Sequence, residues 1–389
     1  MKIVHMCLAS FYPDHYSYQE NMLPKFHKLQ GHDVEVLASL VSFDSKGKQV
    51  LLKNAGTYIN EYGIQVTRLN YKEPLKLYKR LRRYSGTKEA LEKMAPDVLF
   101  IHGCQFLDID IVAKYAKTHP DLKIFVDNHA DFANSASNWL SKNILHKIIW
   151  KHCAHIINPY TEKFYGVLPA RVDFLKNVYG LPEEKCELLV IGADDELVKE
   201  AAAPDVRRRI REKYQIAKDD FLIVTGGKIN KNRPETLHLM QAVNKISDPH
   251  VKLLIFGNVS AELKDDFEKS AASANIIYIG WIKSEESYPL FAAGDLVVFP
   301  GLHSVMWEQA AAQGKPCVFK KIEGFDHVDL GGNAVFLENS SAQEIEDVLR
   351  SLINDPAKIL KMKEAAEQYG MKTFSYNDIA KRGIESKQH

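Results

Sequence analysis

Short apolar runs and longer mixed segments alternate along almost the whole chain. In the first half, the apolar runs that read as strands are "KIVHMCLA", "DVEVLASL", "DVLFIHG", "KIFVDNH" and "AHIINP". After a polar, alanine-containing segment near residues 196–206 the alternation begins again, with "DFLIVTGG", "VKLLIFGN", "IIYIG", "DLVVFPG" and "PCVFKK". Because continuous apolar strands alternating with helices are typical of parallel sheets covered on both faces, the pattern predicts an α/β protein.

The two series of strands predict two doubly wound, parallel-sheet domains, residues 1–195 and residues 196–371. In such folds ligands bind outside the carboxyl ends of the strands. We therefore expect the site at these ends, in a cleft that the two domains face.

The composition argues against several classes of protein. The chain is 46% hydrophobic and 26% charged, and its 51 Lys and Arg against 50 Asp and Glu give a net charge of +1, which offers no general attraction for nucleic acid. The five cysteines form no CxxC pair and no cluster at zinc spacing. No run approaches the roughly 18 apolar residues of a membrane span, and the N-terminus resembles a strand rather than a signal peptide. We expect a cytoplasmic protein without a metal site.

One loop has the residues that a diphosphate requires. The strand "DFLIVTGG" ends in Gly226 and Gly227, and Lys228, Lys231 and Arg233 follow before a helix that begins near Pro234. Glycines let the backbone approach a ligand closely, and cations beside a helix N-terminus favour phosphate. The alternative is an ordinary loop with solvated lysines, because neither GxxxxGK[ST] nor GxGxxG is present.

A second loop, "PGLHSVMWEQAAAQGKP" at residues 300–316, follows the strand "DLVVF". Ser304 is a good N-cap type, so we expect a helix from about Ser304 whose first amides, with Val305, point to the same place as the glycine loop. Glu308 lies one turn into this helix. It either complements the helix dipole or accepts hydrogen bonds from a diol such as ribose.

These residues carry a resemblance to the family 4 glycosyltransferases of the GT-B fold. The family pattern is roughly "G-R-L…K" in the phosphate loop and "E-x7-E-A-x-A-x-G-x-P-V" in the nucleotide helix, and Lys228, Arg233 and Glu308 fall on its basic and second acidic positions. "PKFHKLQGHDVEV", "PDVLFIHG" and "VIGADDE" also resemble family segments. The resemblance implies two Rossmann-like domains, an N-terminal one for the acceptor and a C-terminal one for the nucleotide-sugar donor. It also implies a last helix, about 372–389, that packs back on the first domain.

The resemblance further implies a retaining reaction that needs no metal or other cofactor. Lys228 and Arg233 would stabilise the leaving nucleoside diphosphate, and His129 or Asp131 in "VDNHAD" would support the sugar from the first domain. The sequence departs from the family at Pro300, where the first glutamate would contact the donor sugar. We expect His303 to take the place of this glutamate. The nucleotide contacts are thus expected at Gly226, Gly227, Lys228, Arg233, His303, Ser304, Val305 and Glu308.

Three functions remain open. The first is a hexosyltransferase-type enzyme that moves a sugar, from UDP by family frequency, to a glycan or lipid-linked acceptor in surface polysaccharide or glycoconjugate assembly. The second is a non-catalytic sugar-nucleotide-binding partner of another glycosyltransferase, suggested by Pro300. The third is a sugar-nucleotide epimerase of similar architecture. A dehydrogenase is the least favoured reading, because no strand ends in GxGxxG with an acid roughly 20 residues beyond it.

Two more segments have alternative interpretations. "LDIDI" contains Asp108 and Asp110 as a DxD triplet, but acids that open a helix explain it better than a metal site. Residues 74–84, "PLKLYKRLRRY", form either a basic amphipathic helix on the inner membrane surface, to which residues 139–151 add, or a solvated helix of the domain.

Overall fold

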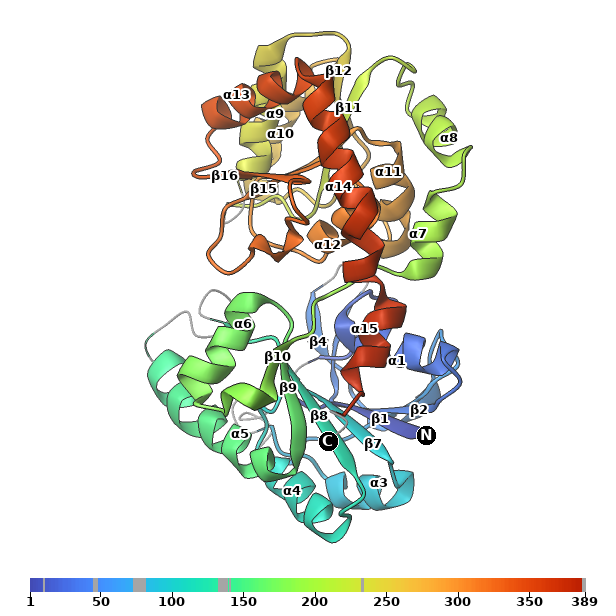
Figure 1. Ribbon diagram of the computed structural model, residues 1–389, viewed down its shortest axis with the longest axis vertical. Helices are drawn as coiled ribbons and strands as arrows, with labels where there is room; N and C mark the ends of the chain where they lie inside the picture. The colour runs from blue at the N-terminus through green and yellow to red at the C-terminus, as the bar shows by residue number, and fades with distance from the viewer. Residues whose placement is uncertain are drawn as a thin grey trace. The chain divides into compact units, whose positions relative to one another are not determined.

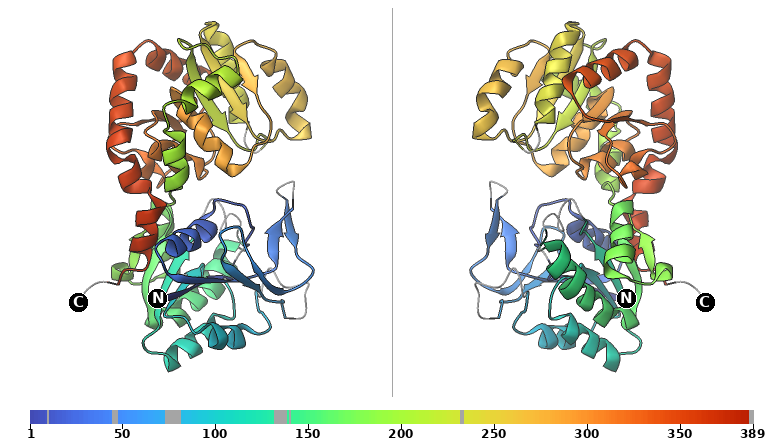
Figure 2. Two further views of the ribbon diagram at one scale, coloured as in Figure 1. Left: turned by 90° about the vertical axis from the view of Figure 1, so that its right-hand side faces the viewer. Right: turned by 90° about the vertical axis from the view of Figure 1, so that its left-hand side faces the viewer.

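The structure, a computed structural model, describes residues 1–9, 11–44, 48–72, 82–131, 139, 141–231 and 234–386. The chain divides into two compact units: unit 1 comprises Met1–Ile191 and Tyr376–His389, and unit 2 comprises Gly192–Ser375. Each unit is a sheet with helices on both faces, as Figures 1 and 2 show.

Unit 1 follows the predicted alternation of strands and helices, with short strands added. Its elements are β1 (Lys2–Cys7), α1 (Gln19–Leu29), β2 (Asp33–Ala38), β3 (Val41–Phe43), β4 (Gln49–Leu51), β5 (Gly56–Ile59), β6 (Gln65–Arg68), α3 (Thr87–Met94), β7 (Val98–His102), α4 (Ile109–Thr118), β8 (Lys123–Asn128), the π-helix η2 (Ser141–Trp150), α5 (Lys151–Ile157), η3 (Asn158–Tyr160), β9 (Thr161–Gly166), α6 (Pro169–Phe174), η4 (Leu175–Tyr179), η5 (Glu183–Lys185), β10 (Cys186–Leu188) and α15 (Tyr376–Gly383).

The main sheet of unit 1 has the order β10-β9-β8-β7-β1-β2-β6-β5 and is parallel except for β5. Alternate residues of its strands face opposite layers. Val4 and Met6 of β1 belong to a core with α3, α4 and α5, whereas His5 points to the opposite layer, where it contacts His27 of α1. The last helix, α15, packs beside α1 in this layer (Figure 1).

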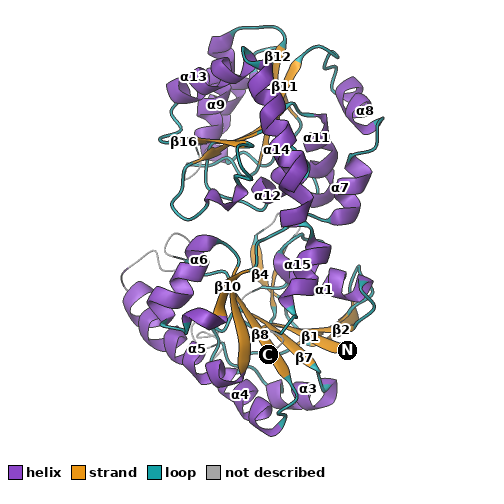
Figure 3. Ribbon diagram, viewed as in Figure 1, coloured by secondary structure: helices purple, strands orange, loops and turns teal. Residues whose placement is uncertain are grey.

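Unit 2 is a parallel sheet in the order β13-β12-β11-β14-β15-β16. Its elements, coloured by type in Figure 3, are α7 (Asp195–Ala201), α8 (Val206–Lys213), β11 (Phe221–Gly226), α9 (Glu235–Ile246), β12 (Val251–Phe256), η6 (Ala261–Leu263), α10 (Lys264–Ala271), β13 (Ile276–Tyr278), η7 (Ser284–Glu286), α11 (Ser287–Ala293), β14 (Leu296–Phe299), α12 (Met306–Ala312), β15 (Cys317–Lys320), η8 (Asp326–Val328), β16 (Ala334–Leu337), α13 (Ala342–Ile353) and α14 (Pro356–Phe374).

One sequence prediction about local structure is wrong. Residues 154–159 were expected to be a strand, but they continue α5 into η3, and the strand β9 follows at Thr161–Gly166. The buried residues Cys153, Ala154 and Ile157 have the spacing of one helix face, so a helix buries them equally well. The units divide at Gly192, close to the expected boundary at residues 195 and 196, and α7 begins at Asp195.

Candidate functional site

The strand order of unit 2 reverses direction between β11 and β14. From β11 the chain adds β12 and then β13 on one side, and from β14 it adds β15 and β16 on the other. In doubly wound sheets ligands bind outside the carboxyl ends of the strands at this point. The two predicted loops, Gly226–Lys228 after β11 and Pro300–Val305 after β14, both begin there.

The loop after β11 favours glycine at two successive positions, for a different reason at each. A Cβ on Gly226 would lie 2.2 Å from the ring of Phe256, and Gly227 has a φ of +123°. A Cβ on Gly227 would stand 3.5 Å from the methyl group of Met306, the first residue of α12. The glycine loop and the start of α12 are therefore neighbours, as the sequence analysis expected for Gly226, Gly227 and Val305.

The cations of this loop are only partly described. Lys228 is exposed, and within the described residues its ammonium group has no ion-pair partner. Arg233, the other expected phosphate contact, lies outside the described residues. An exposed, uncompensated lysine beside a tight glycine loop can bind an anion without first breaking an internal ion pair.

Glu308 is the central residue of the second loop. It is on α12 and is 0% exposed, and its Oε1 atom accepts hydrogen bonds from Nε2 of His303 and Nε2 of His327, both at 2.9 Å. Burial alone would raise its pKa, but the charges and hydrogen bonds of the two histidines lower the pKa to about 2. Its Oε2 atom has no hydrogen-bond partner among the described residues. Glu308 is thus an ionised carboxylate with one oxygen still able to accept a hydrogen bond.

The start of α12 differs from the prediction. Ser304 does not cap the helix, because α12 begins at Met306 with Val305 as its N-cap. The Oγ of Ser304 is buried without a partner in the described chain, while its backbone carbonyl accepts from Trp307. His303 contacts the ring of Trp307 in the first turn of α12, and this ring stacks on Phe319 of β15.

Sequence reasoning missed two residues at this edge. His327 lies in η8, after β15, and reaches Glu308 only through the fold. Glu235 opens α9: its Oε1 pairs with Nζ of Lys320 at 2.7 Å, and its Oε2 lies 3.3 Å from where a Cβ of Gly301 would be. A carboxylate therefore stands beside Pro300 and Gly301, although position 300 itself has none. The helix-opening acid in "RPETL" is the signal that could have found it.

In unit 1, the predicted residues His129 and Asp131 follow β8. Nε2 of His129 lies 3.3 Å from Oδ2 of Asp127 and 3.9 Å from Oε1 of Glu20, and the side chain is 31% exposed. Burial alone would lower the pKa of His129, but these two carboxylates raise it. Asp131 accepts a hydrogen bond from Nε of Arg171 at 2.9 Å, so the structure engages it in a buried ion pair.

Within the described residues, two groups of side chains bring ring nitrogens and carboxylate oxygens close together: His102, Asp127 and His129, and His303, Glu308 and His327. Both groups include candidate site residues. In the second group both histidines hydrogen-bond to one oxygen of Glu308 at 2.9 Å. In the first group His102 hydrogen-bonds to Oδ2 of Asp127 at 2.7 Å, and Nε2 of His129 lies 3.3 Å from the same oxygen. The expectation of a metal-independent reaction stays a prediction. The DxD triplet has a structural role at Asp108, which accepts from the backbone of Tyr84 and the hydroxyl of Thr87.

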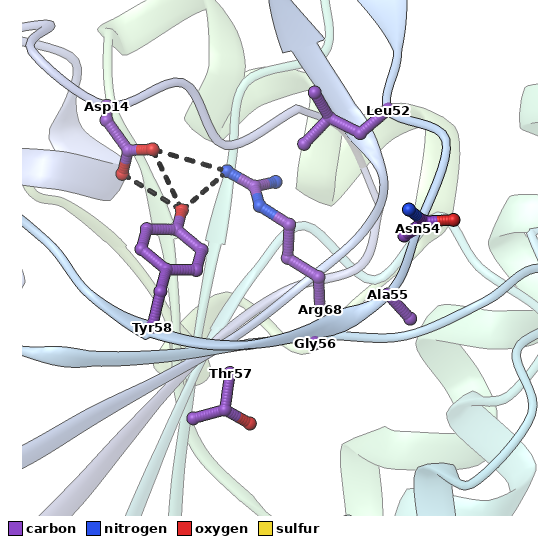
Figure 4. A pocket seen from close by; sticks show the side chains of 8 residues that line it. All are labelled: Asp14, Leu52, Asn54, Ala55, Gly56, Thr57, Tyr58 and Arg68. Atoms are coloured by element: carbon purple, nitrogen blue, oxygen red, sulfur yellow. Dashed lines mark hydrogen bonds and ion pairs between the residues drawn. The ribbon is translucent and has the colours of Figure 1, made fainter.

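Unit 1 also contains a pocket of about 260 Å³, lined by Asp14, Leu52, Asn54, Ala55, Gly56, Thr57, Tyr58 and Arg68. Figure 4 shows Asp14 and Arg68 both directed at the hydroxyl group of Tyr58. Arg68 ends β6, is 4% exposed, and also donates to the carbonyls of Tyr12 and Ser39. The pocket therefore presents hydroxyl, carboxylate and guanidinium groups on one rigid cluster.

The membrane-surface segments are only partly described. Residues 73–81 lie outside the described residues, and at the end of that segment Arg82 faces the ring of Trp150 and donates to the carbonyl of Gln105. Trp139 and Ile148 are 71% and 61% exposed. No helix within the described chain is both long enough and apolar enough to cross a membrane.

Comparisons with known proteins agree with this architecture. Residues 206–369 match the family model of glycosyl transferases group 1. A 217-residue segment is 26% identical to D-inositol 3-phosphate glycosyltransferase 1 of Catenulispora acidiphila and spans 51% of this chain and 50% of that relative, so the match covers half the relative's length.

Solved structures resemble the whole chain. Alr3699/HepE of Anabaena in complex with UDP superposes with a TM-score of 0.69 at 15% identity, covering 98% of both chains. UDP-GlcNAc 2-epimerase of Neisseria meningitidis bound to UDP-GlcNAc gives 0.64 at 14% identity, covering 99% of both. The expected GT-B fold is confirmed, and within its second unit residues 206–369 match the model of glycosyl transferases group 1.

Proposed function

We propose that this protein is a retaining, metal-independent glycosyltransferase that moves a sugar from a nucleotide-sugar donor, a UDP-sugar in the first instance, to a glycan or lipid-linked acceptor. One observation carries the proposal: the glycine loop lies against Met306, the first residue of the helix α12 that carries the buried, ionised Glu308, at the switch point of a domain that matches glycosyl transferases group 1. UDP in the Anabaena structure supports the choice of nucleotide by analogy.

In this proposal unit 2 binds the donor. The backbone of Gly226 and Gly227 allows the diphosphate to approach, and Lys228 and Arg233 stabilise the negative charge that develops on it as the sugar leaves. Oε2 of Glu308, which is buried and has no hydrogen-bond partner among the described residues, accepts a ribose hydroxyl. The hydrogen bonds from His303 and His327 keep the carboxylate ionised. Glu235, beside Pro300, accepts hydroxyls of the donor sugar in place of a residue-300 carboxylate.

Unit 1 then binds the acceptor. His129, with a raised pKa between Glu20 and Asp127, hydrogen-bonds to the reacting sugar or acceptor. The leaving diphosphate oxygen takes the acceptor's proton on the same face of the sugar, so no further base is required. The pocket at Arg68 offers polar groups of the kind that bind glycan hydroxyls. The exposed Trp139 and Ile148, near Lys142 and Lys147, support contact of the cytoplasmic enzyme with an anionic membrane surface.

Calorimetry tests the donor site. UDP, GDP, ADP and dTDP are titrated into the wild type, with and without magnesium, and into Glu308→Ala. We expect one nucleotide, UDP, to bind regardless of magnesium and to lose about tenfold or more in affinity in the variant, since a hydrogen bond to a charged group contributes about 1.5–3 kcal/mol. Asp220→Asn is the matched control, a buried carboxylate paired with His250 just before β11.

The outcomes separate the alternatives. If no nucleotide binds, or if Glu308→Ala and Asp220→Asn behave alike, the donor site is wrong. Nucleotide binding without turnover of any UDP-sugar would indicate the non-catalytic partner. Conversion of a free UDP-sugar into its epimer without an acceptor would indicate the epimerase, a reaction that the Neisseria meningitidis structure makes a specific alternative.

A further inference from the structure

A chain of buried histidines crosses the layer of unit 1 that contains α1 and α15. Nε2 of His27 lies 2.8 Å from the carbonyl oxygen of Ala380, and its Nδ1 lies 2.9 Å from Nε2 of His5. Nδ1 of His5 lies 3.0 Å from Nε2 of His102, whose Nδ1 lies 2.7 Å from Oδ2 of Asp127. The four hydrogen bonds use every ring nitrogen of the three histidines. All five residues are at most 2% exposed.

The two ends of this chain determine how many protons it holds. The carbonyl of Ala380 and an ionised Asp127 are acceptors only, so the ring nitrogens must supply one proton to each hydrogen bond. Four hydrogen bonds need four protons, but three neutral imidazoles carry three. A missing proton would place two lone pairs against each other at about 3 Å in a buried site, where unpaired polar atoms are most costly.

We propose that His5, His27 and His102 together hold one proton more than three neutral rings, that this proton makes His102 an imidazolium against Asp127, and that the pair sets the charge and position of His129. His5, His27 and His102 are positioning residues, because none of them reaches the exposed site. The part that concerns His129 rests on the proposed function, whereas the number of protons does not.

The environment favours His102 as the charged ring. Burial lowers the pKa of His5 well below its usual value and that of His27 to about 4, so these two rings are neutral. Burial would raise the pKa of Asp127, but the charge of His102 and then that of His129 hold it below the usual range, so it is ionised. Other titratable groups act nearby: His32 on His27, Cys7 of β1 with Asp127, and Glu20 of α1 and Arg171 of α6 on His129.

The extra proton is needed because the C-terminal helix α15 supplies the carbonyl of Ala380 as an acceptor for His27. If the carbonyl of Ala380 were not an acceptor for His27, the chain could reverse its direction of donation. Each neutral ring would then donate toward Asp127, and His102 would give its Nδ1 proton to the carboxylate without any charge. The docking of α15 on α1 therefore influences Asp127 and His129 through the three histidine rings.

The experiment is ¹⁵N NMR of the full chain labelled at histidine, at about pH 7.5, where free histidine is mainly neutral. We expect four ring N–H protons on the three histidines in the wild type, with both nitrogens of His102 protonated. In His27→Phe we expect His102 to carry a single proton, on Nδ1, although residue 27 does not touch it. The titration midpoint of His129 should move to higher pH, because Asp127 has lost one positive partner.

His146→Phe is the matched control, a buried histidine of unit 1 that bonds to Tyr179 outside the chain. It should leave His102 and His129 unchanged. Three ring protons in the wild type would overturn the inference without any variant, even if His27→Phe does not fold. An unchanged His129 midpoint in a folded His27→Phe would overturn the role of the chain in setting His129. Failure of the proposed reaction would be seen separately, as absence of sugar transfer.

Discussion

The carbonyl oxygen of Gly227 lies 1.9 Å from the position that a Cβ of Gly257 would occupy. The ends of β11 and β12 thus meet backbone to backbone, and Gly257 has a φ of +121°, which favours glycine. The shape of the glycine loop at the candidate diphosphate site depends on this contact, which comes from a strand that does not itself belong to the site.

We expect Gly257→Ala to push the Gly227 peptide out of place and to weaken nucleotide binding about tenfold or more. Stability should also fall, by roughly 1–3 kcal/mol for strain and overpacking. Calorimetry with UDP and urea unfolding measure the two effects. Gly331→Ala is the control: its φ of +93° imposes similar strain, but no atom lies within 4 Å of its Cβ position. Equal loss of binding in both variants would contradict the contact as the cause.

Lys228 should act on the diphosphate and not on the nucleoside. Its ammonium group is exposed and has no ion-pair partner in the described parts of the chain, so Lys228→Ala leaves no unpaired charge behind. We expect UDP affinity to fall about tenfold, with a weaker salt dependence, while uridine affinity stays unchanged. Lys252→Ala, on β12, is the control cation. If uridine binding falls as much as UDP binding, Lys228 does not contact phosphate.

The pKa of Glu308 predicts an acid-sensitive contribution to the stability of unit 2. Burial opposes ionisation, but His303 and His327 hold the pKa at about 2, below its ordinary value of 4.5. Because the folded-state pKa is depressed, the stabilisation is fully present above about pH 4.5 and is lost as the pH falls toward 2. It amounts to roughly 3 kcal/mol. Urea unfolding of wild type and Glu308→Gln at pH 6 and pH 3 measures it.

The difference between these two proteins in the free energy of unfolding should shrink at pH 3. Asp265→Asn, at an exposed site of α10, should show little difference at either pH. A Glu308→Gln difference that is the same at both pH values would show that the carboxylate is not held ionised by the histidines.

His129 and Asp131 are two residues apart, yet a variant of His129 should lose activity and a variant of Asp131 should lose stability. His129→Gln should leave stability nearly unchanged and lower kcat by roughly 10²–10⁴-fold, the range for a positioned acid–base group. Asp131→Asn breaks the buried pair with Arg171 and should cost about 3–5 kcal/mol of stability. Thermal unfolding and kinetics of sugar transfer separate the two. If Asp131→Asn is stable but inactive, Asp131 takes part in the reaction and is not only a structural residue.

The pattern of apolar and polar residues was sufficient to predict the two strands after which the site loops begin. The apolar runs before Gly226 and Pro300 became β11 and β14, and their loops met because parallel strands end at one edge of a sheet. The same reasoning failed at residues 154–159, where Ile156 and Ile157 suit a helix face as well as a strand. It also placed the start of α12 at about Ser304, whereas the helix begins at Met306, because the presence of a good cap type does not show that its side chain caps the helix.

The amino-acid sequence alone thus determined the α/β alternation, the two sheets, the glycine loop and the position of Glu308, all of which depend on residues close together in the chain. Only the tertiary structure decided which side chains share protons. His327 meets Glu308 across 19 positions, His5 meets His102 across 97, and His27 meets Ala380 across 353. A histidine's charge depends on the partners of both ring nitrogens, and the fold supplies those partners.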